Sequence, residues 1–354
     1  MLEKLKSEKK LIDTWLLNFL DEEEANFNQQ TLVKEAFAII KNFVIGGKTV
    51  RGGLFLLATK ALDAETYEKN QKDLLAVAAA LELIHSSLLI HDDIIDQDET
   101  RRGQDSVWQK YTKSAIKNNY KNPQNYGQNL AICVGNILNY LADLALARVS
   151  NLSQNIQNDL KKTIAQEIIK TNFAEMLDSK ITLQNDLPSK NEVLEMYLFK
   201  TARYTFSSQL QLAGIIKQLS ESQIAKLITI GEKLGMIFQI KDDEISLFST
   251  EKESGKSFAS DIKEGKKTIF YLTLIKNANQ KEQEFLARNM GKRDLDQQTI
   301  ERIQDLFQKY ASSKITETIN QLKEEIQLEI KKIDSIEIKQ LLIEILDFNL
   351  NRNS

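Results

Sequence analysis

The chain has 354 residues, a formal net charge of −3 at pH 7, 42% hydrophobic and 27% charged residues. This composition is typical of a globular protein with a substantial core, and it gives no electrostatic reason to expect nucleic-acid binding. The charged N-terminus does not resemble a signal peptide, and no stretch reaches the roughly 18 apolar residues of a membrane span. We therefore expect a cytoplasmic protein without a transmembrane segment. The single cysteine, Cys133, excludes an intrachain disulfide, and its apolar neighbours predict a buried core position.

Helix breakers are scarce, with two prolines and 13 glycines, so the chain is predicted to be all-α. A polar stretch at 110–128 is interpreted as a surface insertion, and a glycine-containing loop at 249–265 as a lid. Neither resembles a linker, so residues 1–354 are expected to form a single domain. Apolar residues recur at helical spacing in about a dozen segments. These lie near residues 2–20, 30–44, 54–63, 71–96, 128–149, 154–180, 190–215, 221–248, 267–276, 281–289, 297–308 and 314–350.

Two acidic clusters each end a long apolar helical segment. Residues 92–96 read Asp-Asp-Ile-Ile-Asp, and residues 242–246 read Asp-Asp-Glu-Ile-Ser. On a helix Asp92 and Asp96 lie on one face, where like charges repel unless a cation neutralises them. The two clusters therefore favour metal-assisted chemistry on a diphosphate.

Basic residues accompany the acidic clusters along the chain. Residues 46–53, G-G-K-T-V-R-G-G, form a glycine-rich turn whose backbone and cations can approach phosphate oxygens. This turn is not a Walker A loop, because Asn42 stands where the first glycine would be. The other basic elements are Arg101-Arg102, Lys200-Thr201, Lys256 and Lys266-Lys267.

Together these motifs resemble those of the trans-isoprenyl diphosphate (polyprenyl) synthases. Agreement of six elements in the family's order is far more specific than a single acidic motif. The elements are 46–51 (G-G-K-x-x-R), His85, 92–103 (D-D-I-I-D-Q-D-E-T-R-R-G), Lys200-Thr201 (the K-T pair), 238–243 (F-Q-x-x-D-D) and the lysine segment 255–268.

The resemblance implies an isoprenoid synthase fold, in which helices surround a central apolar cavity. It also implies a prenyltransferase that elongates an allylic diphosphate with isopentenyl diphosphate. About three Mg²⁺ ions would bind the allylic diphosphate, so that its carbon–oxygen bond ionises to an allylic cation. Their direct ligands would be Asp92, Asp96 and Asp242, with Asp93 and Asp243 in support.

The same resemblance divides the remaining site residues between the two substrates. The allylic diphosphate would be held by Arg101, Lys200, Gln239 and Lys256, while Thr201 and Lys266 would shield the cation or close the site. Isopentenyl diphosphate would bind without metal, and its diphosphate would be bound by Lys48, Arg51, His85 and Arg102. A homodimer is also implied, with transient membrane contact for product release.

Several positions depart from the family's pattern. Ser246 replaces the last aspartate of the second acidic motif, but no expected direct metal ligand is lost, so we expect catalysis to survive. The other departures are Thr49 and Gly52, where arginine and proline are usual, Asp105 and Trp108, where proline and histidine are common, and Asn136, where aspartate is usual.

Product length is predicted from the helix that precedes the first acidic cluster, because a turn of about 5.4 Å approximates one isoprene unit. Ser87 and Leu88 are not the bulky aromatics that stop growth at fifteen carbons in this family, and the alanines at 78–80 leave further space. We therefore expect a geranylgeranyl (C20) product rather than farnesyl (C15), with longer chains left open.

Two other functions are also left open. A class I terpene cyclase would use an aspartate-rich motif and magnesium, but its second motif normally has glutamate where this chain has Thr250. The other alternative is a regulatory subunit of a heteromeric synthase, against which the intact first motif argues.

Overall fold

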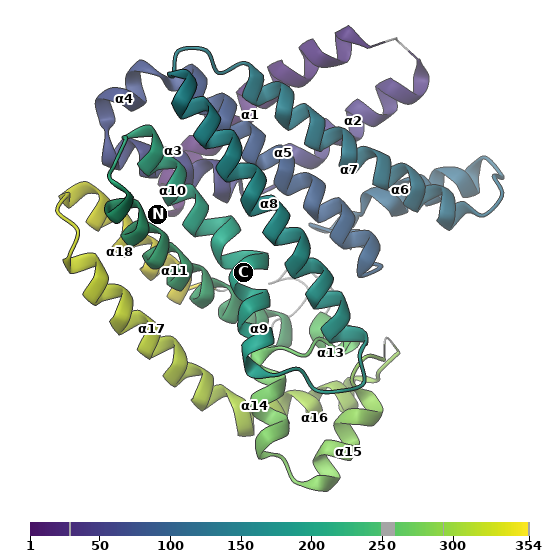
Figure 1. Ribbon diagram of the computed structural model, residues 1–354. Helices are drawn as coiled ribbons and strands as arrows, with labels where there is room; N and C mark the ends of the chain where they lie inside the picture. Colours follow the sequence, from purple (N-terminus) through teal and green to yellow (C-terminus); the bar gives the residue numbers. More distant parts are fainter. Residues whose placement is uncertain (28–29, 249–258, 293, 353–354) are drawn as a thin grey trace. The chain divides into compact units, whose positions relative to one another are not determined.

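The computed structural model describes residues 1–27, 30–248, 259–292 and 294–352. They form two compact units, here called unit 1 (Met1–Lys162 and Leu212–Ser220) and unit 2 (Thr163–Gln211 and Glu221–Ser354). Two helices belong partly to each unit, namely α8 (Gln154–Leu183) and α10 (Ser208–Ile216) (Figure 1).

Unit 1 is built around α5 (Gln71–Ile95), which is apolar on nearly every face. It packs against α7 (Pro123–Ala147), α3 (Val50–Leu62) and α1 (Leu2–Asn26), so that side chains such as Leu74 are fully buried. Each such leucine contributes about 2 kcal/mol through burial. The other elements of unit 1 are α2 (Thr31–Ile45), α4 (Ala64–Lys69), the hairpin of β1 (Thr100–Arg101) and β2 (Gln104–Asp105), and α6 (Val107–Lys117).

Unit 2 has α11 (Glu221–Phe248) as its central helix. It packs against the π-helix η1 (Leu198–Ser207), and a Cβ at Gly235 would lie only 2.3 Å from Ala202 Cα. Glycine at this position therefore lets the two backbones approach. The other elements are α9 (Lys190–Tyr197), α13 (Ser260–Glu264), α14 (Ile269–Asn277), α15 (Gln280–Asn289), α16 (Gln297–Phe307), η2 (Gln308–Ser312), α17 (Ser313–Lys331) and α18 (Ile336–Leu350).

The structure confirms the all-α prediction and corrects parts of it. The stretch 110–128 is largely helical, because Trp108, Tyr111 and Ala115 recur at helical spacing and are buried in α6, which packs against α7. Cys133 is exposed rather than buried, since the periodicity of α7 turns it outward. Most of the predicted lid lies outside the described residues, and the single-domain organisation stays a prediction.

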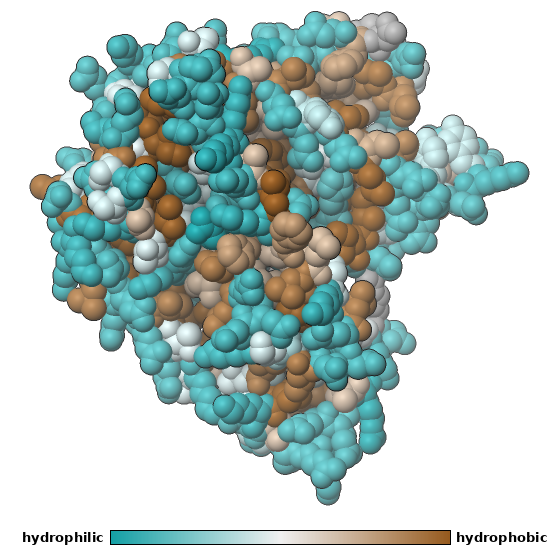
Figure 2. All heavy atoms as spheres, in the orientation of Figure 1, coloured by the Kyte–Doolittle hydropathy of each residue, from teal (hydrophilic) through white to brown (hydrophobic). Residues whose placement is uncertain are grey.

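Two helices, α5 and α7, are long and apolar enough to cross a membrane by length and composition. The most apolar window of α5 is 72% buried within the protein, as in a core helix, whereas that of α7 is 44% buried. Figure 2 shows apolar side chains reaching the surface among polar ones. The exposed apolar side chains of α7 are Ile132, Ile137, Tyr140 and Leu144.

Candidate active site

The glycine-rich turn between α2 and α3 lies against Arg102, which is far away in sequence. Arg102 Nη1 donates a hydrogen bond to the carbonyl of Phe43 at 2.8 Å, and its guanidinium lies over the Phe43 ring. A Cβ at Gly47 would come within 2.9 Å of Arg102 Nη2, so the small residue leaves room for the guanidinium. The fold thus brings Arg102 to the turn that carries Lys48.

His85 lies on α5 near the same arginines. Burial holds the pKa of His85 well below its ordinary value, and the charges of Arg51 and Arg102 lower it further. The imidazole is therefore neutral near pH 7, with one ring N–H to donate. Arg51, His85 and Arg102 form a cluster in unit 1 that is suited to binding an anion.

The first acidic cluster occupies the last turn of α5, and Arg101 returns to it from β1. Arg101 Nε donates a hydrogen bond to Asp93 Oδ1 at 2.6 Å, and its Nη2 lies 3.2 Å from Asp92 Oδ2. Burial raises the pKa of Asp93 to about 7, although the charge of Arg101 acts in the opposite direction. Trp108 Nε1 donates to the carbonyls of Asp93 and Asp98, so it fastens the end of α5 to the following loop.

The second acidic cluster lies on α11 in unit 2, and its two aspartates have different surroundings. Asp243 is buried, and it accepts hydrogen bonds from the Tyr197 hydroxyl and, at 2.7 Å, from Gln239 Nε2. Burial and the charge of Asp261 raise its pKa well above the ordinary value. Asp242 is partly exposed and pairs with Arg352 at 2.9 Å. Asp243 therefore anchors the cluster inside unit 2, whereas Asp242 lies nearer the surface beside Arg352.

Two of the predicted site lysines of unit 2 share one buried carboxylate. Asp178 on α8 lies 2.6 Å from Lys200 Nζ and 3.3 Å from Lys266 Nζ. Thr201 follows Lys200 on η1 and donates a hydrogen bond to Gln239 Oε1 at 2.6 Å. A π-helical turn inside a helix is often found at functional sites, and here it carries both residues.

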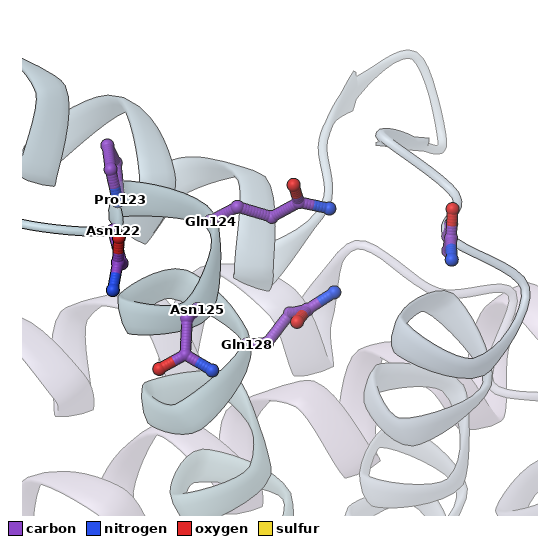
Figure 3. Close-up of a pocket in the computed structure, with 6 residues that line it drawn as sticks. Asn122, Pro123, Gln124, Asn125 and Gln128 are labelled. Carbon is purple, nitrogen blue, oxygen red and sulfur yellow. The ribbon is translucent and has the colours of Figure 1, made fainter.

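A concavity of about 520 Å³ in unit 1 is a separate feature. Figure 3 shows its side chains, among which Gln124 and Gln128 extend in the same direction. None of its lining residues ionises, so it offers neither carboxylates for a metal nor cations for a diphosphate. The lining residues are Gln97, Asn122, Pro123, Gln124, Asn125 and Gln128.

Comparison with known proteins agrees with the arrangement of the motifs. Residues 33–307 match the model of the polyprenyl synthetase family. The chain belongs to the polyprenyl synthetase family. It is accordingly an enzyme, a trans-prenyltransferase.

Individual polyprenyl synthetases cover most of the chain. The geranylgeranyl diphosphate synthase of Saccharolobus solfataricus is 30% identical over 292 residues, 81% of each protein. A short chain isoprenyl diphosphate synthase of Methanothermobacter thermautotrophicus is 27% identical, covering 93% of this chain and 92% of that protein. A solved geranylgeranyl pyrophosphate synthase of Corynebacterium glutamicum, complexed with isoprenyl diphosphate and magnesium, has a TM-score of 0.91 at 26% identity. It covers 98% of this chain and 99% of its own.

Polyprenyl synthetases generally use Mg²⁺, and the donor atoms of this chain fit that ion. No group of three or more histidine, cysteine or acidic side chains in the described part of the chain could by itself hold a metal ion. Mg²⁺ is usually held by one or two carboxylates together with substrate phosphates and water. The Oδ2 atom of Asp93 is buried without a hydrogen-bond partner, which leaves an acceptor for water beside the cluster. These residues therefore fit an ion that binds together with a diphosphate.

The structure also adds residues that motif comparison did not select as functional. Tyr197 and Asp178 hold predicted site residues in place, and Arg352 pairs with a predicted metal ligand. Glu82, which is buried on α5, contacts the glycine-rich segment. No sequence signal marks Asp178 or Arg352, because each is an ordinary polar residue of a helix or its end. Lys256 lies outside the described residues.

Proposed function

We propose that this polyprenyl synthetase condenses an allylic diphosphate with isopentenyl diphosphate and that its main product is geranylgeranyl diphosphate (C20). The product length is inferred from the side chains of α5 just before Asp92. Ser87 is fully buried, and its hydroxyl has no hydrogen-bond partner among the described residues. Neither Ser87 nor the half-buried Leu88 supplies a ring that would stop a growing chain. The similarity to a geranylgeranyl diphosphate synthase supports the same product.

The side chains of two consecutive arginines point in different directions. This supports the assignment of different binding residues to the two substrates. Arg101 extends to Asp92 and Asp93, whereas Arg102, whose φ is 56°, turns to Phe43 and the glycine-rich turn. Arg101 would accordingly hold the allylic diphosphate together with Lys200, Gln239 and Lys256. Arg102 would hold isopentenyl diphosphate together with Lys48, Arg51 and His85.

Magnesium would be held by Asp92, Asp96 and Asp242, with about three ions bound per site. When bound, these ions would neutralise the charge of the leaving diphosphate. The chain's own cations would orient both diphosphates, so that the double bond of isopentenyl diphosphate faces the reacting carbon. Thr201 and Lys266 would shield that carbon from water.

The exposed apolar stripe of α7 supports a homodimer. Ile132, Tyr140 and Leu144 are 43%, 71% and 42% exposed and lie at intervals of four or eight residues on one face. A second copy of the chain would cover this stripe, and light scattering on the purified protein measures that association. We further propose a cytoplasmic enzyme that contacts a membrane transiently when it releases its product.

Product analysis tests the proposed function. The purified chain with Mg²⁺, isopentenyl diphosphate and farnesyl diphosphate should give a C20 product, and a reaction that yields nothing beyond C15 would contradict the proposal. A regulatory subunit would release no diphosphate, and a cyclase would release it without isopentenyl diphosphate. Ser87→Phe should shorten the product to C15, whereas Lys72→Phe, at an exposed position on the first turn of α5, should not.

A further inference from the structure

A buried glutamate on α5 contacts the start of the helix that follows the glycine-rich turn. Glu82 is 4% exposed, and its Oε1 accepts a hydrogen bond from the Gly52 backbone N–H at 2.7 Å. The Arg51 backbone N–H also hydrogen-bonds this carboxylate. One side chain of α5 thus holds two N–H groups at the start of α3.

These N–H groups have no acceptor within their own helix. The first N–H groups of any α-helix lack intrahelical partners, and a side chain of the preceding residue commonly supplies one. The residue before α3 is Thr49, which has a φ of 52° and makes no side-chain capping bond. The capping group of α3 is therefore Glu82, which comes from another helix.

The contact also depends on the residue at position 52. A Cβ at Gly52 would lie 2.7 Å from the Ala78 carbonyl oxygen, so the close approach of α3 to α5 requires glycine. Proline, which is usual at this place in the family, has no N–H to donate. The substitution of glycine for proline thus gives this chain the Gly52–Glu82 hydrogen bond.

Glu82 also lies within the electric field of the cations around the turn. Burial raises the pKa of Glu82, while the charges of Arg51 and Arg102 act to lower it. The charge of Glu82 acts to raise the pKa of Arg102, whereas the charge of Arg51 acts to lower it. His85 follows Glu82 by three residues on α5 and therefore shares its face. Glu82 is thus an acidic group within a cluster of cations.

We propose that Glu82 is a positioning residue for isopentenyl diphosphate, because it holds the start of α3 and thereby fixes where Lys48 and Arg51 present their charges. This inference rests on the proposed function. It assigns Glu82 no contact with substrate, and its effect passes through the two cations.

The same helix offers a matched control for a merely structural role. Asp73 is fully buried, and its Oδ2 accepts hydrogen bonds from the backbone N–H groups of Ser150, Asn151 and Leu152 at 3.0, 2.6 and 3.1 Å. Asp73 therefore binds backbone N–H groups of the loop after α7, as Glu82 binds those at the start of α3. The cations of the glycine-rich segment are not among its partners.

The experiment compares Glu82→Leu, Glu82→Gln and Asp73→Asn with the wild-type chain. Steady-state kinetics give the KM of each substrate, calorimetry gives the Kd of isopentenyl diphosphate without Mg²⁺, and circular dichroism gives Tm. Glu82→Leu should raise the KM and Kd of isopentenyl diphosphate about tenfold, and Glu82→Gln, which keeps an acceptor, about threefold. The KM of the allylic diphosphate should stay within about twofold. Asp73→Asn should lower Tm and leave both KM values unchanged.

Two results would overturn the inference. One is an unchanged Kd of isopentenyl diphosphate in both Glu82 variants. The other is a parallel rise of both KM values that follows the loss of Tm. If Glu82→Leu does not fold, Glu82→Gln decides alone, since it preserves shape and one acceptor. Failure of the proposed function is distinct, because the wild-type chain would then not bind or consume isopentenyl diphosphate.

Discussion

Replacement of Asp178 by asparagine should destabilise unit 2 in a pH-dependent way. Burial acts to raise the pKa of Asp178, but the charges of Lys200 and Lys266 outweigh it and lower the pKa from 3.8 to about 2. The Asp178 side chain is only 8% exposed, so solvent screens these pairs little. Lowering the pKa from 3.8 to about 2 corresponds to about 2.5 kcal/mol of stability at neutral pH.

The sign of the pH dependence follows from the direction of the change in pKa. A carboxylate with a lowered pKa in the folded state stabilises the protein above the unfolded-state pKa. This contribution is lost as the pH falls through the folded-state pKa. The free energies of unfolding of wild type and Asp178→Asn should therefore differ by about 2.5 kcal/mol from pH 7 down to about 5 and converge between about pH 4 and 2.

Urea unfolding at several pH values measures this difference. Both tryptophans, Trp15 and Trp108, lie in unit 1, so far-UV circular dichroism is needed to follow unit 2. Asp159→Asn removes an exposed carboxylate from the same helix and serves as the control. Parallel curves for wild type and Asp178→Asn over the whole pH range would refute the reasoning.

Three further predictions concern the site. Tyr197→Phe removes the hydroxyl that donates to Asp243 and accepts from the Ile269 N–H. It should lower the free energy of unfolding by about 3 kcal/mol, which thermal melting measures, and lower kcat, which steady-state kinetics measure. Gly235→Ala places a Cβ 2.3 Å from Ala202 Cα, and the displaced η1 should lower both Tm and activity. Chelation with EDTA should abolish turnover but preserve binding of isopentenyl diphosphate in calorimetry, and loss of both would contradict the metal-free assignment.

Much of the fold could be predicted because its signals are local. The apolar run that ends at the first acidic cluster predicted α5 to within a residue at its end, and the polar–apolar period predicted α11 equally well. The helix α6 was missed because its polar surface dominates the composition of 110–128, while its few apolar residues are buried against α7. The side on which Cys133 faces depends on the rotation of α7 within unit 1, which an apolar neighbourhood does not specify.

Candidate site residues could be selected from the sequence wherever they belong to motifs of fixed spacing. The adjacent pair Arg101-Arg102 was recognised from its sequence, but only the hairpin and the left-handed Arg102 direct the two side chains to different partners. Tyr197 escaped detection because a tyrosine in a helix is common, and its bond to Asp243 joins residues that lie 46 positions apart.

One physical requirement connects the residues that the motifs did not reveal. Cations gathered to bind a diphosphate repel one another before the anion arrives, and the repulsion is strongest where water is excluded. In unit 1 the carboxylate of Glu82 lies among Arg51 and Arg102, and in unit 2 that of Asp178 lies between Lys200 and Lys266. Each carboxylate therefore offsets part of the repulsion between the cations around it. The residues that set this balance belong to neighbouring helices, so only the folded chain identifies them.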